Sequence, residues 1–351
     1  MNPRTCLALA LAMALQPVAA NAADGWTANL RYRHEAVSDD AFARDAEADT
    51  LRLRLGYSHA FAHGFSAGAE LEAVAAADGR YNSTANGRGS YPVVADPEAF
   101  ELNQAWLRWR GERGGATLGR QRLLLDNQRF VGNVGWRQNE QTYDALSVDF
   151  TPREGLVLRY AWLDRVHRVF GDEAIDPLAR ERDLDAHLAN VAWSGAAGTL
   201  VGYGYWLDDQ DVATASTRTL GLRYTGQHAM GPATLGWTLE LANQRDHAGN
   251  PLPVDAGYVL VEPSLAAKGL TWKLGRERLG GDGTTAFQTP LATLHAFNGW
   301  ADKFLVTPAN GLDDRYASVS GKFGSGRLEG KLGWTLAFHD FQADRGGADY
   351  G

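Results

Sequence analysis

Cysteine is nearly absent from this chain of 351 residues, because the only one is Cys6. It lies at the start of an apolar run that ends at Leu15, where it is poorly placed for a lipoprotein cleavage site. Arg4 precedes the run and the small residues Ala20-Asn21-Ala22 follow it, which is the layout of a secretory signal. We therefore predict a signal peptide over residues 1–22. The mature chain is then expected to lack thiols, disulfides and cysteine metal sites.

Long apolar runs are also missing. A helix that crosses a bilayer needs about 20 apolar residues. The run in the first 22 residues is far shorter, which argues against a membrane anchor, and no later run is long enough either. No Pro-rich or Ser-rich linker divides the chain, which favours one large architecture over two or three soluble domains. Any membrane role must therefore use strands.

Patterns that carry chemistry are scarce. The chain has nine histidines, and none sits in a short Ser-His or His-x-x-x-His arrangement that could supply a nucleophile and base or a metal site. His295 shares a segment with Asp302, for which a hydrogen-bonded loop histidine is the better interpretation. Residues 280–283 are Gly-rich, but no helix follows them, so they indicate a turn. The sequence predicts no enzyme, cofactor, metal site or nucleic-acid partner.

What the chain does contain is alternation. In segments of about ten residues, apolar side chains occupy every second position, which is the period of a strand with two different faces. Residues 51–55 read Leu-Arg-Leu-Arg-Leu, for example. The pattern predicts fifteen strands, at residues 25–36, 50–62, 65–76, 100–111, 115–124, 143–151, 155–166, 185–194, 198–208, 217–227, 233–245, 257–267, 269–279, 314–323 and 326–341.

The connections between these strands alternate strictly between short turns and long loops such as 77–99, 124–142, 167–184 and 280–313. This layout is typical of an outer-membrane barrel. A soluble sandwich of this length would need two domains. A solenoid or propeller should repeat every 20 to 50 residues, and the sequence shows no such repeat. Aromatic residues near strand ends also fit the two interfacial belts, namely Trp26, Tyr57, Trp109, Trp162, Trp193 and Tyr224.

The predicted fold is an all-β, transmembrane, antiparallel up-and-down barrel over residues 23–351. Such barrels close with an even number of strands, and an open edge in lipid leaves backbone groups unsatisfied. Fifteen strands are odd in number, and no terminal strand ends in an aromatic residue. We therefore expect the last strands of the barrel to be missing from this sequence.

Assigning the apolar positions to lipid turns the alternate positions inward. The basic residues so placed are Arg31, Arg33, Arg52, Arg54, Arg108, Arg110, Arg159, Arg165, Arg223, Lys273 and Lys331. The acidic ones are Glu35, Glu70, Glu72, Asp149, Glu240, Glu277 and Glu329. This positive excess, in a chain whose net charge is −8, predicts a lumen that favours anions. The alternative is that inward arginines and glutamates simply pair, and a one-residue bulge would reverse some assignments.

Two segments, residues 119–143 and 283–305, mix aromatic and apolar residues with Arg, Gln and Asn, which is unusual for loops that merely face water. We expect both to fold into the barrel mouth, with Arg120, Arg129, Arg137 and Lys303 projecting into the channel. Guanidinium groups bind carboxylates in bidentate fashion. The alternative, that these loops only brace or plug the barrel, is compatible with lining it.

At these two segments the chain resembles the alginate-export porin family. The matching stretches are Gly119-Arg120-Gln121, Arg129-Phe130-Val131-Gly132 through Gln141-Thr142-Tyr143-Asp144, Phe287 through Leu294, and Asn298 through Phe304. The resemblance implies a monomeric barrel of 18 strands with an Arg-rich constriction that passes an anionic polysaccharide. With fifteen strands predicted from the alternation, three strands would then be absent here. Of the site residues that the resemblance implies, the loop arginines Arg120, Arg129 and Arg137 are the best supported.

The resulting hypothesis is an outer-membrane porin of a Gram-negative bacterium with an anion-preferring lumen. Its expected partners are outer-membrane lipid and lipopolysaccharide, the barrel-assembly machinery, and small anions or an anionic polysaccharide. A general porin without polysaccharide specificity, a barrel-type enzyme and a loop-based receptor remain alternatives. The candidate pore-lining and substrate-binding residues are Arg31, Arg33, Arg52, Arg54, Arg120, Arg129, Arg137, Gln138, Arg159, Arg223, Asp302 and Lys303.

Overall fold

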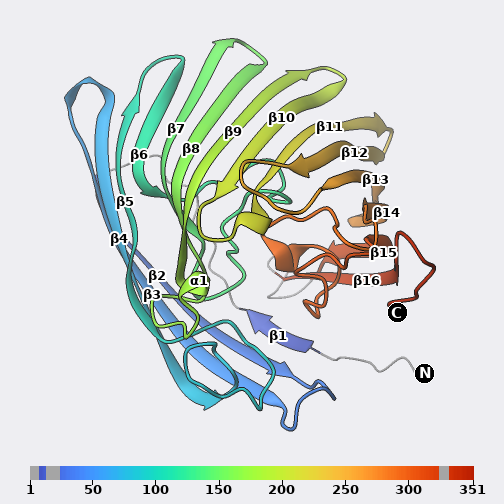
Figure 1. Ribbon diagram of the computed structural model, residues 1–351. Helices are drawn as coiled ribbons and strands as arrows, with labels where there is room; N and C mark the ends of the chain where they lie inside the picture. The colour runs from blue at the N-terminus through green and yellow to red at the C-terminus, as the bar shows by residue number, and fades with distance from the viewer. Residues whose placement is uncertain (1–7, 13–23, 324–331) are drawn as a thin grey trace.

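The computed structural model describes residues 8–12, 24–323 and 332–351. Its strands form one antiparallel sheet of sixteen, in which each strand pairs with the next along the chain. Figure 1 shows this sheet curving around a space that loop segments enter. The strands are β1 (Ala8–Ala12), β2 (Gly25–Val37), β3 (Ala46–Ala60), β4 (Phe65–Arg80), β5 (Ala99–Arg110), β6 (Gly114–Gln121), β7 (Thr142–Arg153), β8 (Leu156–His167), β9 (Glu181–Gly195), β10 (Gly198–Asp209), β11 (Thr217–Met230), β12 (Ala233–Asp246), β13 (Asp255–Ala267), β14 (Leu270–Leu279), β15 (Leu312–Lys322) and β16 (Gly333–Gln342).

Helices are few and short in the described residues. They are α1 (Pro177–Arg180) and the 3-10 turns η1 (Ala62–Gly64), η2 (Ala213–Ala215) and η3 (Leu294–Ala296). None of the helices in the described ranges is long and apolar enough to cross a membrane.

The all-β, up-and-down prediction is confirmed. Strands β2 to β16 correspond one by one to the fifteen predicted segments, although residues 324–331 of the last turn and strand lie outside the described residues. Strand β1 falls inside the segment predicted as a signal peptide and pairs with β2, with Ala8 opposite Val37. Across the described strands, β1 and β16 are the two edges and the sheet is open between them.

The two faces of the sheet differ as the alternation predicts. On β3, Leu51, Leu53 and Leu55 are each more than 40% exposed, whereas Arg52 and Arg54 between them are 5% and 9% exposed. Exposed leucines on a regular face suit lipid, and buried arginines require polar partners inside. The apolar face of the strands is therefore the outer face, and the arginines face the enclosed space.

Aromatic residues cluster on the outer face near the short turns. Trp26, at the start of β2, is 72% exposed and lies 5.0 Å from the ring of Tyr57, at the end of β3. Trp109 and Trp193 are exposed at the equivalent ends of β5 and β9. Amphipathic rings of this kind occupy the membrane–water interface, so this row follows the rim of the short turns.

The turn between β3 and β4 shows how tightly the short connections are built. Gly64 adopts φ +81° and a Cβ there would lie 2.2 Å from the carbonyl oxygen of Arg110. A side chain at this position would clash with the backbone at the end of β5, so only glycine fits. The long connections, residues 81–98, 122–141, 168–180 and 280–311, all lie at the opposite rim.

One inward assignment is wrong because of a bulge. The pairing of β8 with β9 shifts register between Leu163 and Arg165. Leu163 and Val166 are buried, and Arg165 turns to the outer face, where Nη2 lies 2.7 Å from Oδ1 of Asp183. One extra residue reverses the face of every side chain beyond it. Lys331 and Glu329, also assigned inward, lie outside the described residues.

Candidate functional site: an arginine ladder and two inward loops

Two long loops fold into the space enclosed by the sheet. The first inward loop, residues 122–141, connects β6 to β7, and the second, residues 280–311, connects β14 to β15. Gln138 of the first loop donates from Nε2 to Oγ1 of Thr50 on β3 at 2.8 Å, while Arg129 donates from Nε to Oε1 of Glu277 on β14 at 2.6 Å. Strands β3 and β14 are far apart in the sheet. The first inward loop therefore crosses the lumen.

The two loops are also joined to each other. The Gly132 amide donates to the Leu291 carbonyl at 2.9 Å, and the Thr293 amide donates to the Gln128 carbonyl at 3.0 Å. Trp136 stacks on His295 with ring centroids 4.1 Å apart. These contacts make a single layer from segments that are far apart in sequence, as expected for loops that pack rather than face water.

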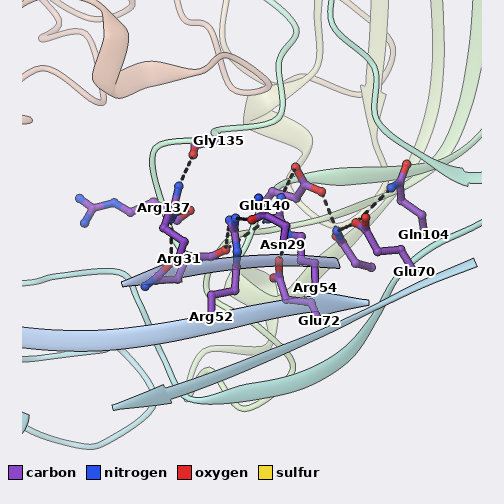
Figure 2. Close-up of polar contacts among 12 residues, drawn as sticks. Asn29, Arg31, Arg52, Arg54, Glu70, Glu72, Gln104, Gly135, Arg137 and Glu140 are labelled. Carbon is purple, nitrogen blue, oxygen red and sulfur yellow. Dashed lines mark hydrogen bonds and ion pairs between the residues drawn. The ribbon is translucent and has the colours of Figure 1, made fainter. Parts of the chain in front are cut away.

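Four arginines on neighbouring strands lie against this layer, and we call them the arginine ladder: Arg31 and Arg33 on β2, and Arg52 and Arg54 on β3. All are at most 9% exposed, and Arg31 stands directly opposite Arg52 in the register. Figure 2 shows three of them beside the first inward loop. Like charges paired across strands repel, and the repulsion grows as water is excluded. The ladder therefore requires compensating groups.

Two members of the ladder are compensated by carboxylates. Arg33 forms ion pairs with Glu35, at 2.6 Å, and with Asp96 of the 81–98 loop. Arg54 pairs with Glu72 of β4 and lies 3.4 Å from Glu140. Neither partner of such a buried ion pair can move away without leaving an uncompensated charge in the interior. These two arginines thus serve mainly to hold strands and loops together.

The other two members, Arg31 and Arg52, are held by neutral oxygens. Arg31 donates to Oε1 of Gln138 and to the Gly135 carbonyl, both at 2.9 Å, and also to the carbonyls of Trp136 and Arg137. Arg52 donates to the Gln138 carbonyl at 3.2 Å and to Oδ1 of Asn29 at 2.6 Å. Within the described residues, neither forms an ion pair with a carboxylate. Their charges remain uncancelled by direct partners.

Gln138, one of the predicted site residues, is the point where the loop meets the ladder. It is 0% exposed. Its backbone N–H donates to Oδ1 of Asp96 at 2.7 Å, and its backbone carbonyl accepts from Arg52 and Arg54, both at 3.2 Å. Its side chain bonds Arg31 and Thr50. Every polar group of this residue is thus engaged, which is what a buried amide requires.

Glu140 supplies negative charge next to the ladder. Its carboxylate accepts from Nε of Arg122 at 2.5 Å, from Nδ2 of Asn103 at 2.6 Å and from Nδ2 of Asn133 at 2.7 Å. Burial alone would raise the pKa of Glu140, but the positive charges of Arg54 and Arg122 outweigh it and lower that pKa to about 2. Glu140 is therefore a permanent anion that neutralises one end of the ladder.

The remaining loop residues of the prediction have different positions. Arg129 is 2% exposed and is enclosed by Glu277, Thr289 and Asn298, so it braces the loop against β14. Arg137 joins Glu35 at 3.0 Å to Asp302 at 2.9 Å. Asp302 also accepts from His295 at 2.7 Å, which agrees with the interpretation of His295 as a hydrogen-bonded loop histidine.

Arg120 lies away from the lumen, and Lys303 lies beside Asp39 in the connection between β2 and β3. Arg120 belongs to β6 rather than to the loop, and it shares the outer face with the exposed Leu118, while Gln121 and Thr117 are buried on the inner face. Its Nε lies 3.0 Å from Oδ1 of Asp144. The prediction that Arg120 projects into the channel is therefore wrong. Lys303 is half-exposed and lies 2.6 Å from Asp39.

Two further predicted residues lie on the wall of β8 to β12. Arg223 of β11 pairs with Glu240 of β12. Arg159 of β8 shares its face with the buried Ala161 and Leu163, so it points inward, yet it is exposed. Both act electrostatically on Asp126 of the first inward loop. Burial raises the pKa of the Asp126 carboxyl, and the positive charges of Arg223 and Arg159 partly offset that rise. Arg159 is therefore an inward cation accessible to solvent.

Some residues of the site escape sequence reasoning. Asp96 is 0% exposed and joins Arg33 to the Gln138 amide, but it lies in a loop without periodicity. Arg122 and Glu140 bond one another across the first inward loop. Only the density of charged and amide residues in that loop pointed to packing, and no pattern indicated the partners.

A sheet with a lipid-facing outer surface, and an inner face lined with arginines and crossed by loops, defines an outer-membrane β-barrel channel. Residues 26–259 match the model of the alginate export family, and the chain belongs to that family. The resemblance is thereby confirmed, and the protein is placed in the outer membrane of a Gram-negative bacterium. No curated protein matches the sequence.

Solved porin structures share the fold. The outer membrane protein OpdK of Pseudomonas aeruginosa is 16% identical, with a TM-score of 0.63 over 92% of this chain and 95% of that one. OccAB1 of Acinetobacter baumannii is 11% identical, with a TM-score of 0.71 over 90% and 80%. OccK2 (OpdF) of Pseudomonas aeruginosa, in complex with glucuronate, is 15% identical, with a TM-score of 0.62 over 90% and 92%.

Proposed function

We propose that this channel prefers anions and passes solutes that carry carboxylates, in particular uronate saccharides. The observation that carries the proposal is the state of Arg31 and Arg52, two inward guanidinium groups bonded only to neutral oxygens. Arginines in a pore lower the barrier for anions. A guanidinium also matches a carboxylate in bidentate geometry.

The inner wall offers further cations beyond the ladder. Arg159 is exposed on β8, and Arg108 of β5 lies over the ring of Trp106 at 4.5 Å. An anion that leaves the ladder would therefore meet more positive charge along the wall. The opposing idea, that inward arginines only pair with inward glutamates, accounts for Arg54 with Glu72 and Arg223 with Glu240. It does not account for Arg31 and Arg52, which bond to neutral oxygens within the described residues.

The comparisons support the cargo class. The family is described as alginate export, and alginate is a polymer of uronates. Of the similar structures, OccK2 holds glucuronate and OpdK holds vanillate, both of which are carboxylates. Transport of uronate polymers or oligomers is therefore the specific form of the proposal, and a general anion-preferring porin is its coarser form.

The test is ion selectivity in planar bilayers. Under a KCl gradient, the wild-type reversal potential should report a preference for chloride, and the double variant R31Q/R52Q should move it toward zero. The matched control is R182Q, because Arg182 is also buried and inward but pairs with Asp209 away from the ladder. Cation selectivity of the wild type would overturn the proposal. Failure of added glucuronate to reduce the chloride current would overturn its uronate form.

A further inference from the structure

The segment that occupies Arg31 and Arg52 belongs to the protein itself. The carbonyl oxygens of Gly135, Trp136, Arg137 and Gln138 point at the two guanidinium groups, together with the side-chain oxygen of Gln138. Several oxygens converging on paired arginines form the arrangement that a carboxylate would offer. Figure 2 shows the Gly135 carbonyl facing Arg31 in this way.

We propose that residues 133–139 of the first inward loop act as an internal substitute for the cargo, seated on Arg31 and Arg52 until a carboxylate displaces them. This inference rests on the proposed function, since it assigns the same two arginines as the cargo site. It adds that, in the absence of cargo, the two guanidinium groups are covered by the protein's own backbone, and that cargo uncovers them.

The chemistry favours exchange. A hydrogen bond from a guanidinium to a carboxylate is roughly twice as strong as one between neutral groups. A carbonyl carries only a partial charge, so a carboxylate competes for the same donors. The contact between the loop segment 133–139 and the two arginines also leaves polar atoms unbonded, in the part of the chain that the structure describes. Nε of Arg52 and both polar atoms of the Asn139 side chain are buried without a hydrogen-bond partner.

The backbone of the seated segment is strained. Val134 adopts φ +52°, a left-handed conformation that is a genuine outlier for a β-branched residue. A β-branched residue in this conformation stores backbone strain, and release of the segment from the ladder would relieve part of it. Several contacts oppose release, among them the ion pairs of Arg137 with Glu35 and Asp302 and the bonds of Gln138 to Asp96 and Thr50. The seated and released states are thus in competition.

The movement is confined by firm anchors on its N-terminal side. Val131 is 2% exposed and forms a parallel bridge with Leu291, and the Gly132 amide donates to the Leu291 carbonyl. Arg129 is locked by Glu277. Residues 129–132 should therefore stay in place while residues 133–139 swing away from the ladder.

A cysteine reporter tests this directly, because Cys6 is the only cysteine in the sequence. In a C6S background, N139C places a thiol at a position that is 1% exposed. The substitution removes no side-chain hydrogen bond to any described residue, because the Asn139 side chain forms none there. The protein is reconstituted in vesicles and treated with a water-soluble maleimide. Sodium glucuronate should accelerate labelling by about tenfold relative to sodium chloride at equal ionic strength. A tenfold change corresponds to a shift of about 1.4 kcal/mol in the free energy of releasing the segment.

Two further variants make the result specific. The control reporter V131C, in the anchored part of the same loop, should label slowly in both salts. Adding R31Q and R52Q to N139C should make labelling fast in chloride alone and insensitive to glucuronate, because the seat is then lost. Near-ultraviolet circular dichroism of each variant should show that the fold is retained.

Several outcomes overturn the inference. Equal rates for N139C in the two salts would show that cargo displaces nothing, and fast labelling in chloride would show that the segment is not seated. Acceleration of V131C together with N139C would show general loosening of the loop. If selectivity measured on the same preparation still favours chloride, these outcomes refute the displaceable segment alone and leave the proposed function standing.

Discussion

Arg137 and Asp302 form an ion pair at 2.9 Å although 165 residues separate them in the chain. The pair joins the two inward loops where both face the ladder, and His295 bonds the second oxygen of the same carboxylate at 2.7 Å. With exposed side-chain fractions of 9% and 17%, the pair is largely desolvated. It therefore couples the position of one loop to that of the other.

Replacing this carboxylate should loosen the two loops. D302N keeps the shape but removes the charge, so Arg137 retains only Glu35, and a cost of about 1–3 kcal/mol in the free energy of unfolding is expected. Urea unfolding in detergent micelles measures the change, and single-channel recordings should show more frequent current fluctuations. K303M is the adjacent control, because Lys303 is half-exposed and exposed pairs contribute about 0–1 kcal/mol. Equal losses in both variants would contradict the assigned role.

Arg129 should be among the most costly single positions to change. It is 2% exposed and pairs with Glu277 at 2.6 Å, so R129M leaves the carboxylate of Glu277 buried without its cationic partner. A loss of about 3–5 kcal/mol is expected. The double variant R129M/E277L should recover much of the loss, because replacing both members of a buried pair with apolar residues is often neutral. A double variant as unstable as the sum of the two singles would show that no coupling exists.

The outer face can be tested within one strand. Leu53 is 43% exposed and stands between two ladder arginines. L53R places a third arginine on β3, but on the lipid face, where it should destabilise the folded barrel by about 2–4 kcal/mol if it lies near the bilayer centre. T238R, on the inner face of β12 where Thr238 is half-buried two residues from Glu240, serves as the control for added charge. Similar losses for both variants would argue against the assignment of faces.

The fold was predictable because its signal is periodic. Leucines alternating with arginines at residues 51–55 identify a strand, its lipid face and its inner face at once, and the alternation of turn lengths adds the architecture. The same reasoning failed at Arg165, where a bulge turns the side chain from the inner to the outer face. No residue type in this segment indicates the bulge. It failed at Arg120 because Arg120 was assigned to the channel as a loop residue, without the alternation of the predicted strand 115–124, in which it shares a face with the exposed Leu118.

The site was predictable only in its composition. Arginines and amides in the two loops indicated packing, and Arg31, Arg52 and Gln138 were identified as candidates from alternation and loop content. Their mutual bonding depends on where a loop of twenty residues, 122–141, folds back, which local periodicity does not encode. Asp96 illustrates the limit, because its role comes entirely from the distant Arg33 and Gln138.

Glu140 predicts how stability depends on pH. Burial raises its pKa, Arg54 and Arg122 lower it more, and the folded value is about 2 against an ordinary 4.5. Because the folded pKa is the lower one, the contribution is fully present above about pH 5 and is lost as pH falls toward 2. The difference corresponds to about 3 kcal/mol. E140Q should therefore be less stable at pH 7, with a flatter profile between pH 5 and 2 in urea unfolding. E154Q, at an exposed turn position, should keep the wild-type profile. An unchanged slope in E140Q would mean that other carboxylates carry the acid sensitivity.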